Sequence, residues 1–279
     1  MPAKRPVPEA ERHARRARRK SERLSFSSLV LALTLAFLFL PLAVIAFFSF
    51  NDGKGAQFAG FSLRWYRTLF FDSAPLWESL LNSAIVALAS ASAATVLGAS
   101  AAVGAAWYRF RGKTYIRAVT FLPMALPEVI VGVSLLVFFR RFGVPLGMGT
   151  IIVAHVTFCL PFVFMMVGAR LEEFDFSVVE AARDLGATER QTMLRVVVPA
   201  LAPGILSGFM LAATMSLEDF VITFFVAGPG STTLPLYIYS MIRLGVSPVV
   251  NALSVVLVIG TVLAVVLLRR FLKTFASAQ

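Results

Sequence analysis

Three carboxylates lie inside long apolar stretches of this 279-residue chain. Glu128 is in LPMALPEVIVGV, and Glu218 and Asp219 are neighbours in MSLEDFVITFF. A charge at the centre of a bilayer costs about 2.5–3.5 kcal/mol on insertion scales, so such groups normally face a polar cavity or a partner. If these stretches cross a membrane, the three residues are candidates for a polar passage through it.

The spacing of these carboxylates limits how they can be used. Adjacent residues lie about 100° apart on a helix, so we expect one of Glu218 and Asp219 to face the passage and the other to bond a neighbouring helix. At about 1.5 Å per residue, Glu218 lies roughly 21 Å along its helix from Gly204, and Glu128 roughly 18 Å from Ile116. These similar depths, just outside the midplane, are where transporter substrate sites tend to lie.

A second polar feature is the segment SVVEAARDLGATERQTMLRVVVP, residues 177–199, which lies between two apolar runs. Ser177 with Glu180 fits a capping box, and Thr188 repeats the pattern with a glutamine three residues later. Gly186 lies between them, where the end of a helix often requires a positive φ. The pattern predicts two short helices joined by a tight glycine turn.

We expect these helices at about 178–185 and 189–198. A compact helix-turn-helix of this kind is suited to docking into the groove of a partner protein. The alternative is a loop that lies on lipid headgroups.

The elements that hold these residues are predicted by composition. Hydrophobic residues make up 58% of the chain and charged residues 15%, whereas a soluble domain carries about 25% charged residues. A membrane-spanning helix needs about 20 apolar residues, and six runs qualify: 29–50, 83–108, 115–139, 149–167, 204–226 and 249–271. The sequence therefore predicts an all-α, polytopic membrane bundle of six transmembrane helices. Ala94, Gly98 and Ala102 recur every fourth position in the second run, which favours close helix packing.

The distribution of Lys and Arg predicts the orientation of the chain. The first 28 residues hold nine of them, and the loops near 109–117 and 170–195 hold four each. Both termini and the 177–199 segment are therefore expected on the cytoplasmic side. The net charge of +11 then serves topology and contact with anionic lipid rather than nucleic acid binding. The first run is too long for a cleavable signal and should remain as an anchor.

Other potential sites are weak. The stretch RGKT at 111–114 resembles the end of a P-loop, but a P-loop needs a glycine five positions before Gly112, where this chain has Trp107. Nucleotide binding would therefore belong to another subunit. His155 and Cys159 are poor evidence for a metal site, and we expect packing or a hydrogen bond between helices there.

The 177–199 segment resembles the signature of ABC importer permeases, which reads EAA, three residues, glycine, nine residues and an apolar pair ending in proline. Further stretches, FSFNDG, RFRGK, HVTFCLPFV, MSLEDFVITFFVAGPG and LPLYIYSMIRLGVSPVVNAL, resemble spermidine/putrescine permeases of the second-subunit type. The resemblance implies a type I ABC importer permease fold whose coupling helix enters a cleft in a cytoplasmic ATPase. The residues that it implies for this coupling are Glu180, Ala181, Ala182, Asp184, Gly186 and Arg190.

The charge pattern and the apolar runs predict a basic cytoplasmic tail at 1–28, a first transmembrane helix at 29–50 and a cytoplasmic tail at 267–279. The resemblance, which does not include the basic tail, implies a permease domain at 77–266. The implied location is the bacterial inner membrane. The implied partners are a homologous permease, two copies of an ABC ATPase and an extracytoplasmic polyamine-binding protein. No catalytic residue, metal or cofactor is expected in this chain, since the ATPase would bind ATP and Mg.

A polyamine passage would need anionic contacts and aromatic walls. Glu128, Glu218 and Asp219 would supply the charge. Tyr237 and Tyr239, in the outer loop before the last run, are candidates for its entrance or for interfacial anchors. Two alternatives remain: the same machine carrying another solute, such as an amino acid or opine, and a channel or intramembrane enzyme without an ATPase.

Overall fold

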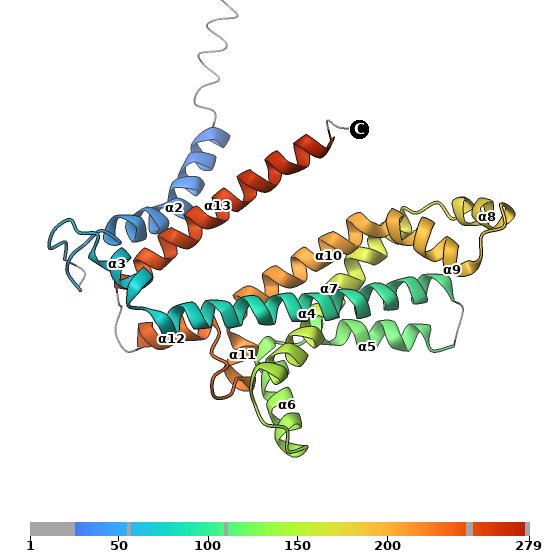
Figure 1. Cartoon of the computed structure of the whole chain (residues 1–279), viewed down its shortest axis with the longest axis horizontal. Coiled ribbons are helices and arrows are strands. Elements are labelled where there is room, and N and C mark those ends of the chain that lie inside the picture. The colour runs from blue at the N-terminus through green and yellow to red at the C-terminus, as the bar shows by residue number, and fades with distance from the viewer. Residues whose placement is uncertain (1–25, 55–56, 109–110, 244–247, 277–279) are drawn as a thin grey trace, which may run out of the picture. The chain divides into compact units, whose positions relative to one another are not determined.

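The computed structural model describes residues 26–54, 57–108, 111–243 and 248–276 (Figure 1). The basic tail predicted at 1–28 lies almost entirely outside these ranges. By its internal contacts the chain divides into a unit of Ser73–Gly245 and a unit made of the residues up to Asp72 and from Val246 onward. Within the described ranges the chain is helical and has no β-strand; its helices are α2 (Phe26–Phe48), α3 (Arg64–Phe71), α4 (Ala74–Trp107), α5 (Lys113–Ala125), α6 (Glu128–Arg141), α7 (Met148–Glu172), α8 (Ser177–Asp184), α9 (Glu189–Thr192), a π-helical turn (Met193–Val197), α10 (Val198–Glu218), α11 (Val221–Val226), α12 (Leu234–Arg243) and α13 (Pro248–Ala276).

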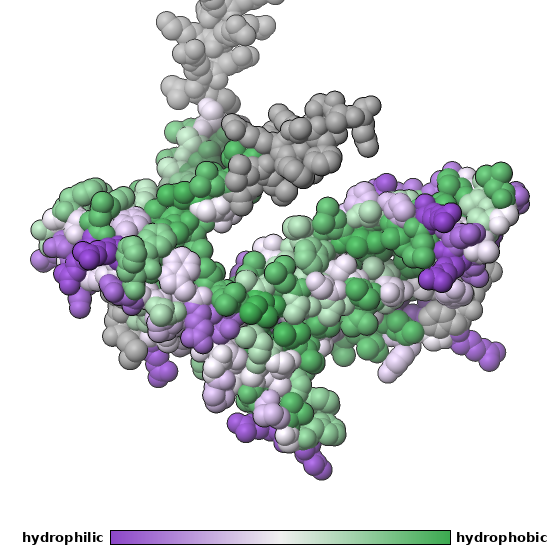
Figure 2. Space-filling view, viewed as in Figure 1, coloured by the Kyte–Doolittle hydropathy of each residue, from purple (hydrophilic) through white to green (hydrophobic). Residues whose placement is uncertain are grey.

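Most of the predicted membrane spans are present as long apolar helices. In the described residues, α2, α4, α7 and the continuous helix Glu189–Glu218 are each long and apolar enough to cross a membrane. A fifth span is formed if α5 and α6 are taken together, and α13 contributes the shorter apolar helix Pro248–Leu263. In the Ser73–Gly245 unit, apolar residues cover much of the surface in view, and hydrophilic residues gather at the α8–α9 end (Figure 2). The prediction of an all-α membrane bundle is confirmed.

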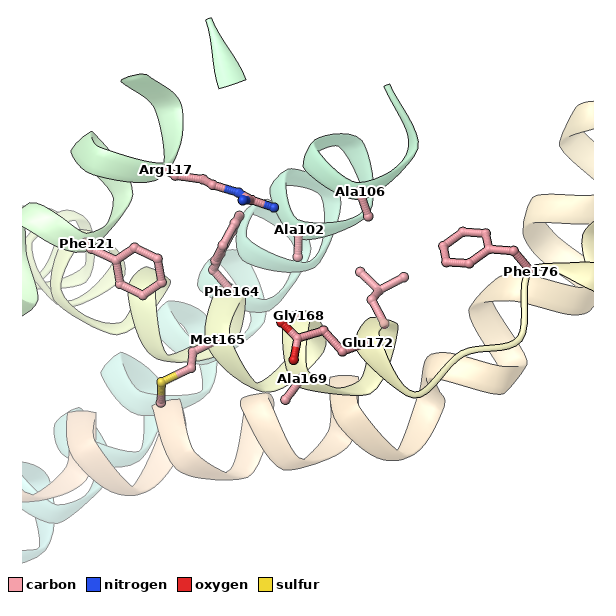
Figure 3. Close-up of a pocket in the computed structure, with 11 residues that line it drawn as sticks. Ala102, Ala106, Arg117, Phe121, Phe164, Met165, Gly168, Ala169, Glu172 and Phe176 are labelled. Atoms are coloured by element: carbon pink, nitrogen blue, oxygen red, sulfur yellow. The ribbon is translucent and has the colours of Figure 1, made fainter. Parts of the chain in front are cut away.

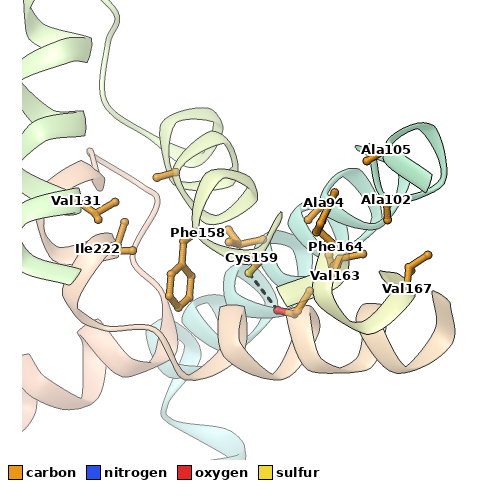
Figure 4. Packing of buried hydrophobic residues seen from close by; sticks show 14 of the residues in the cluster. Ala94, Ala102, Ala105, Val131, Phe158, Cys159, Val163, Phe164, Val167 and Ile222 are labelled. Carbon is orange, nitrogen blue, oxygen red and sulfur yellow. Dashed lines mark hydrogen bonds between the residues drawn. The ribbon is translucent and has the colours of Figure 1, made fainter. Parts of the chain in front are cut away.

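The core of the Ser73–Gly245 unit forms where α4, α7 and α10 pack together (Figure 4). The predicted stripe of small residues lies in this contact: Ala94 is fully buried, and a Cβ added to Gly98 would lie 2.9 Å from the Cβ of Val163. Gly208 on α10 faces the same valine, since its added Cβ would lie 3.2 Å from Val163 Cγ1. Small residues on two helices thus let both approach α7 closely.

Two of the predicted membrane spans are interrupted by breaks that we did not expect from the sequence. The third run divides into α5 and α6, and the helix direction bends by 109° between them. Pro127 lies at this break and has no N–H to continue the helix. The fifth run divides where α10 ends at Glu218 and α11 begins at Val221. The halves beyond the breaks pack on each other, and a Cβ added to Gly132 of α6 would lie 2.7 Å from Phe225 Cδ2 of α11.

The second helix of the 177–199 segment does not end at about residue 198, as we expected. It continues through the π-helical turn into α10, so that Glu189–Glu218 is one helix of 30 residues. In the turn, Val198 N–H donates to the carbonyl of Met193, five residues back. The next residue, Pro199, has no N–H to donate, and the wider turn accommodates this loss within a continuous helix.

The other unit contains α2, α3 and α13, with α13 packed on both of the others. The loop after α2 is fixed to α3 by polar contacts. Trp65 Nε1 donates to the Asn51 carbonyl at 2.7 Å, and the hydroxyls of Ser49 and Tyr66 lie 2.8 Å apart.

Candidate functional site

The turn between α8 and α9 is held by backbone hydrogen bonds and one glycine. Gly186 has φ of 83°, as predicted for a glycine turn. Its N–H donates to the Arg183 carbonyl at 2.9 Å, and Ala187 N–H donates to the Ala182 carbonyl at 3.0 Å. This pair of bonds is the Schellman motif, which satisfies the last carbonyls of α8 and reverses the chain.

The ends of the two helices are capped differently. Thr188 accepts from Gln191 N–H at 3.3 Å, and Gln191 Oε1 accepts from Thr188 N–H at 2.9 Å, so the second predicted capping box is confirmed. The capping box predicted at Ser177 is wrong, because Ser177 is the first residue of α8, Phe176 is its N-cap, and the Glu180 N–H donates to the Phe176 carbonyl. Asp175 Oδ1 instead accepts from Ser177 N–H at 2.9 Å. This bond, together with a side-chain bond to Ser177, holds the pKa of Asp175 below its usual value.

The α8–α9 element presents an exposed surface of mixed character. Val179 is its anchor, with 4% of its surface exposed, whereas Leu185 is 89% exposed at the turn. Five of the six residues predicted to couple to an ATPase are exposed, and the sixth, Ala182, is half-buried; the five are Glu180, Ala181, Asp184, Gly186 and Arg190. The described part of the chain thus leaves an apolar side chain uncovered at the tip of the turn, beside charged residues.

The predicted carboxylates lie at the two helix breaks. Glu218 is the last residue of α10, and Glu128 is the first residue of α6. Both are exposed, and neither forms a hydrogen bond or ion pair with the described part of the chain. Both groups are therefore free to meet a solute or a partner.

Asp219 has the other role that we expected for one member of the pair. It is buried with 7% of its surface exposed, and its carboxylate accepts from the backbone N–H groups of Ile222 at 3.2 Å and Thr223 at 2.8 Å. The Thr223 hydroxyl donates to Asp219 Oδ2 at 2.8 Å. Asp219 thus caps the first turn of α11.

His155 on α7 joins this network. Its Nε2 lies 3.1 Å from Asp219 Oδ2 and 3.0 Å from the Thr223 hydroxyl, and its Nδ1 lies 2.7 Å from the Ser216 hydroxyl. Cys159 Sγ, one turn along α7, donates to the Ala212 carbonyl at 3.5 Å (Figure 4). The predicted hydrogen bonding between helices at both positions is confirmed.

We did not predict the partners of His155 from the sequence. Ser216, Asp219 and Thr223 are polar residues at spacings of three and four within an apolar run. On a helix this spacing places them along one face, and it is the signal that could have revealed the network.

The two tyrosines differ in their surroundings. The ring of Tyr239 on α12 lies 4.7 Å from Phe220 and 6.3 Å from Phe224, measured between centroids. Phe220 lies in the α10–α11 break, two residues after Glu218 in the sequence. The Tyr239 ring therefore lies beside this break. Tyr237 is half-buried in the same short helix.

A cavity of about 500 Å³ opens near the α8 end of the same unit, between α4, α5 and α7 (Figure 3). Phe121, Phe164 and Phe176 line it, and the head groups of Arg117 and Glu172 point into it. A cation from α5 and an anion from α7 thus line the cavity together, so it lacks the net negative charge that a polyamine site needs. In the described ranges no group of three His, Cys, Asp or Glu side chains could hold a metal ion.

Comparisons with known proteins agree on the class. Residues 94–276 match the family described as the binding-protein-dependent transport system inner membrane component. The chain is 38% identical over 232 residues to the spermidine/putrescine transport system permease protein PotC of Escherichia coli K12, covering 83% of this chain and 88% of the relative. It is 40% identical over 258 residues to the putrescine transport system permease protein PotI of the same strain, covering 90% and 91%.

Among solved structures, a bacterial ABC transporter involved in alginate import matches with a TM-score of 0.71 at 17% identity, over 88% of this chain and 94% of that one. The predicted ABC importer permease fold is confirmed, as is the prediction that the chain is a transport subunit rather than an enzyme. The chain belongs to the family of inner membrane components of binding-protein-dependent transport systems.

Proposed function

We propose that this chain forms half of the translocation pathway of an ATP-driven importer for polyamines, putrescine or spermidine. PotC and PotI, which are named as permeases for these solutes, support the solute class. Polyamines carry two or three ammonium groups on flexible methylene chains, so their passage needs separated anionic contacts and aromatic walls. The exposed, unpaired carboxylate of Glu218 at the α10–α11 break is the observation that carries the proposal.

The surroundings of Glu218 suit an ammonium group. The rings of Phe220 and Tyr239 lie together beside the same break and can add cation–π attraction to the charge of the carboxylate. Glu128 supplies a second anionic contact at the other break, on α6, which packs against α11. In this arrangement Asp219 acts from behind the passage, since its oxygens are already bonded, and Tyr237 lies further along α12.

The route from the coupling surface to this site is a single helix. Arg190 lies in its first turn and Glu218 is its last residue, 30 residues in all, which is roughly 45 Å at about 1.5 Å per residue. A continuous helix of this kind would carry a displacement at the α8–α9 turn to the carboxylate at its other end. The exposed Leu185, Ala181 and Glu180 would contact the ATPase.

The remaining assembly completes the machine. A homologous permease forms the other half of the pathway, two ATPase copies bind ATP and Mg, and an extracytoplasmic binding protein delivers the polyamine. ATPase closure pushes the coupling helices and turns the passage outward, and hydrolysis resets it. The distribution of Lys and Arg supports cytoplasmic termini and a cytoplasmic α8–α9 turn. The domain boundaries at 1–28, 29–50, 77–266 and 267–279 remain part of this proposal.

The test replaces Glu218 with glutamine, which keeps the size of the side chain and removes its charge. Uptake of labelled putrescine and spermidine is measured in proteoliposomes that contain the assembled transporter, its ATPase and its binding protein. A lost hydrogen bond to a charged group costs about 1.5–3 kcal/mol, so we expect kcat/KM for uptake to fall roughly 10- to 100-fold. Glu78→Gln, at another exposed glutamate on an apolar helix, is the matched control and should transport normally.

Three results would count against the proposal. Unchanged kinetics for Glu218→Gln would remove this carboxylate from the passage. Uptake of an amino acid or opine that is unaffected by the substitution, with no polyamine uptake, would identify a different solute. Solute flux without ATP would point instead to a channel.

A further inference from the structure

His155 makes contacts on both sides of the break that interrupts the fifth span. It lies on α7 and is fully buried. Through Nδ1 it meets Ser216 on α10, and through Nε2 it meets Asp219 at the break and Thr223 on α11. One imidazole therefore bonds both halves of the broken helix and the residue between them.

The hydrogen bonds assign a proton to one nitrogen of the ring. Asp219 Oδ2 already accepts the Thr223 hydroxyl proton, so the Thr223 oxygen is an acceptor toward His155. Nε2 then carries the proton that is shared between Asp219 and Thr223. Nδ1 lies 2.7 Å from the Ser216 hydroxyl, and either group can be the donor in that bond. Each polar atom facing the ring therefore has a partner, as buried polar groups require.

The break needs this support from the side. A helix that stops inside an apolar layer leaves backbone groups without partners, and each unsatisfied group is costly there. Asp219 satisfies two N–H groups of α11, but a buried carboxylate is itself costly unless it is further bonded. His155 supplies that bond and ties it to α7, a core helix.

We propose that His155 is a positioning residue for transport: it holds the α10–α11 break and thereby sets the Glu218 carboxylate toward the passage. Ser216 lies two residues before Glu218 and Asp219 directly after it, so the same ring holds the backbone on both sides of Glu218. This inference rests on the proposed function only for the role of Glu218 in the passage. The geometric part, that His155 determines the orientation of position 218, stands without it.

The test uses a thiol at that position. Cys159, a buried cysteine and the only one in the sequence, is replaced by alanine, and Glu218→Cys is added. The labelling rate by a charged, water-soluble methanethiosulfonate is measured in the assembled transporter. His155→Ala should change this labelling rate about tenfold or more, because it removes a whole network of hydrogen bonds rather than a single contact. His155→Gln, which keeps a donor toward Asp219 and an acceptor toward Ser216, should restore most of the original rate.

Ile151→Ala is the matched control. Ile151 lies on α7 one turn before His155 and is equally buried, so its truncation opens a buried cavity without removing any hydrogen bond to Ser216, Asp219 or Thr223. Its labelling rate should stay within about threefold of the parent, although the protein loses stability. Equal rates in the parent and in His155→Ala would overturn the proposal, and so would equal shifts in the two alanine variants or a thiol that the reagent never reaches.

A separate measurement distinguishes this inference from the proposed function. Polyamine uptake is compared in the His155 variants with Glu218 intact, and His155→Ala should lose at least about tenfold in kcat/KM while His155→Gln recovers it. If Glu218→Gln transports normally but the labelling rate still depends on His155, the proposed passage fails and the positioning role survives. If Glu218→Gln is impaired and the labelling rate ignores His155, only the positioning role fails.

Discussion

Replacing Gly186 with alanine tests whether the α8–α9 turn is a preformed coupling element. Gly186 has φ of 83°, and nothing lies within 4 Å of the Cβ that alanine would add. The whole effect is therefore backbone strain, which for a residue with a Cβ in the left-handed region is about 1–2 kcal/mol. This cost multiplies the opening equilibrium of the turn by roughly 5- to 30-fold.

The assay is hydrogen exchange of the purified protein in lipid nanodiscs, read at the amides of Gly186 and Ala187. Both amides donate in the Schellman motif, so their protection reports the turn directly. Gly104→Ala is the control: it also has nothing within 4 Å but lies inside α4, where alanine stabilises by about 1 kcal/mol. Gly186→Asn should fall between glycine and alanine, because asparagine tolerates this backbone region.

The result should extend to coupling. A turn that opens more easily should retain less ATPase through purification, in the order glycine, asparagine, alanine. Unchanged protection in Gly186→Ala would refute the assigned backbone geometry. Lost protection with full retention of the ATPase would show that the ordered turn is not what the ATPase recognises.

Three further predictions concern the same unit. The lowered pKa of Asp175 means that its ionised form stabilises the start of α8. Hydrogen-exchange protection of the Ser177 amide, corrected for the intrinsic exchange rate, should therefore be full at neutral pH and be lost below about pH 4. Asp175→Asn should lack this acid dependence. Thr188→Ala removes the N-cap of α9 and should cost about 1 kcal/mol, seen as faster exchange at Gln191, and no change there would contradict the capping box. Gly228→Ala would place a Cβ 1.9 Å from the Leu146 carbonyl oxygen, so the melting temperature should fall, whereas Gly149→Ala, which lies in α7 with nothing within 4 Å, should not lower it.

Periodicity and composition were enough to predict most of the long apolar helices and the α8–α9 element, but not the short helices α3 and α12. Apolar runs of about 20 residues leave few structures other than membrane helices, and Gly186 has a single common role at its position. The resemblance to ABC importer permeases was also carried by this element. The cap of α8 was missed because Asp175 and Ser177 are both good capping residues. The structure uses Asp175, which accepts the Ser177 N–H, and Ser177 is already inside the helix.

The helix breaks were missed for a different reason. An apolar run predicts burial in lipid equally well whether its helix is straight or bent. Pro127 was a visible signal for the first break, but Pro41, Pro161 and Pro203 lie inside helices that continue. A proline therefore predicts a weak point, and the tertiary contacts of α6 with α11 decide whether the chain turns there.

The carboxylates and the breaks have a common cause. A charged residue in an apolar span has two explanations, a solute that needs it or a backbone that needs it, and the sequence alone does not separate them. The structure does so at adjacent positions: Asp219 satisfies the amides of α11 and the ring of His155, while Glu218 satisfies no described group. The break that makes Asp219 necessary also ends the helix at Glu218 and exposes its carboxylate. A single interruption of α10 thus provides both a fixed point in the core and a free charge at the surface, which is what a passage driven from the far end of the same helix requires.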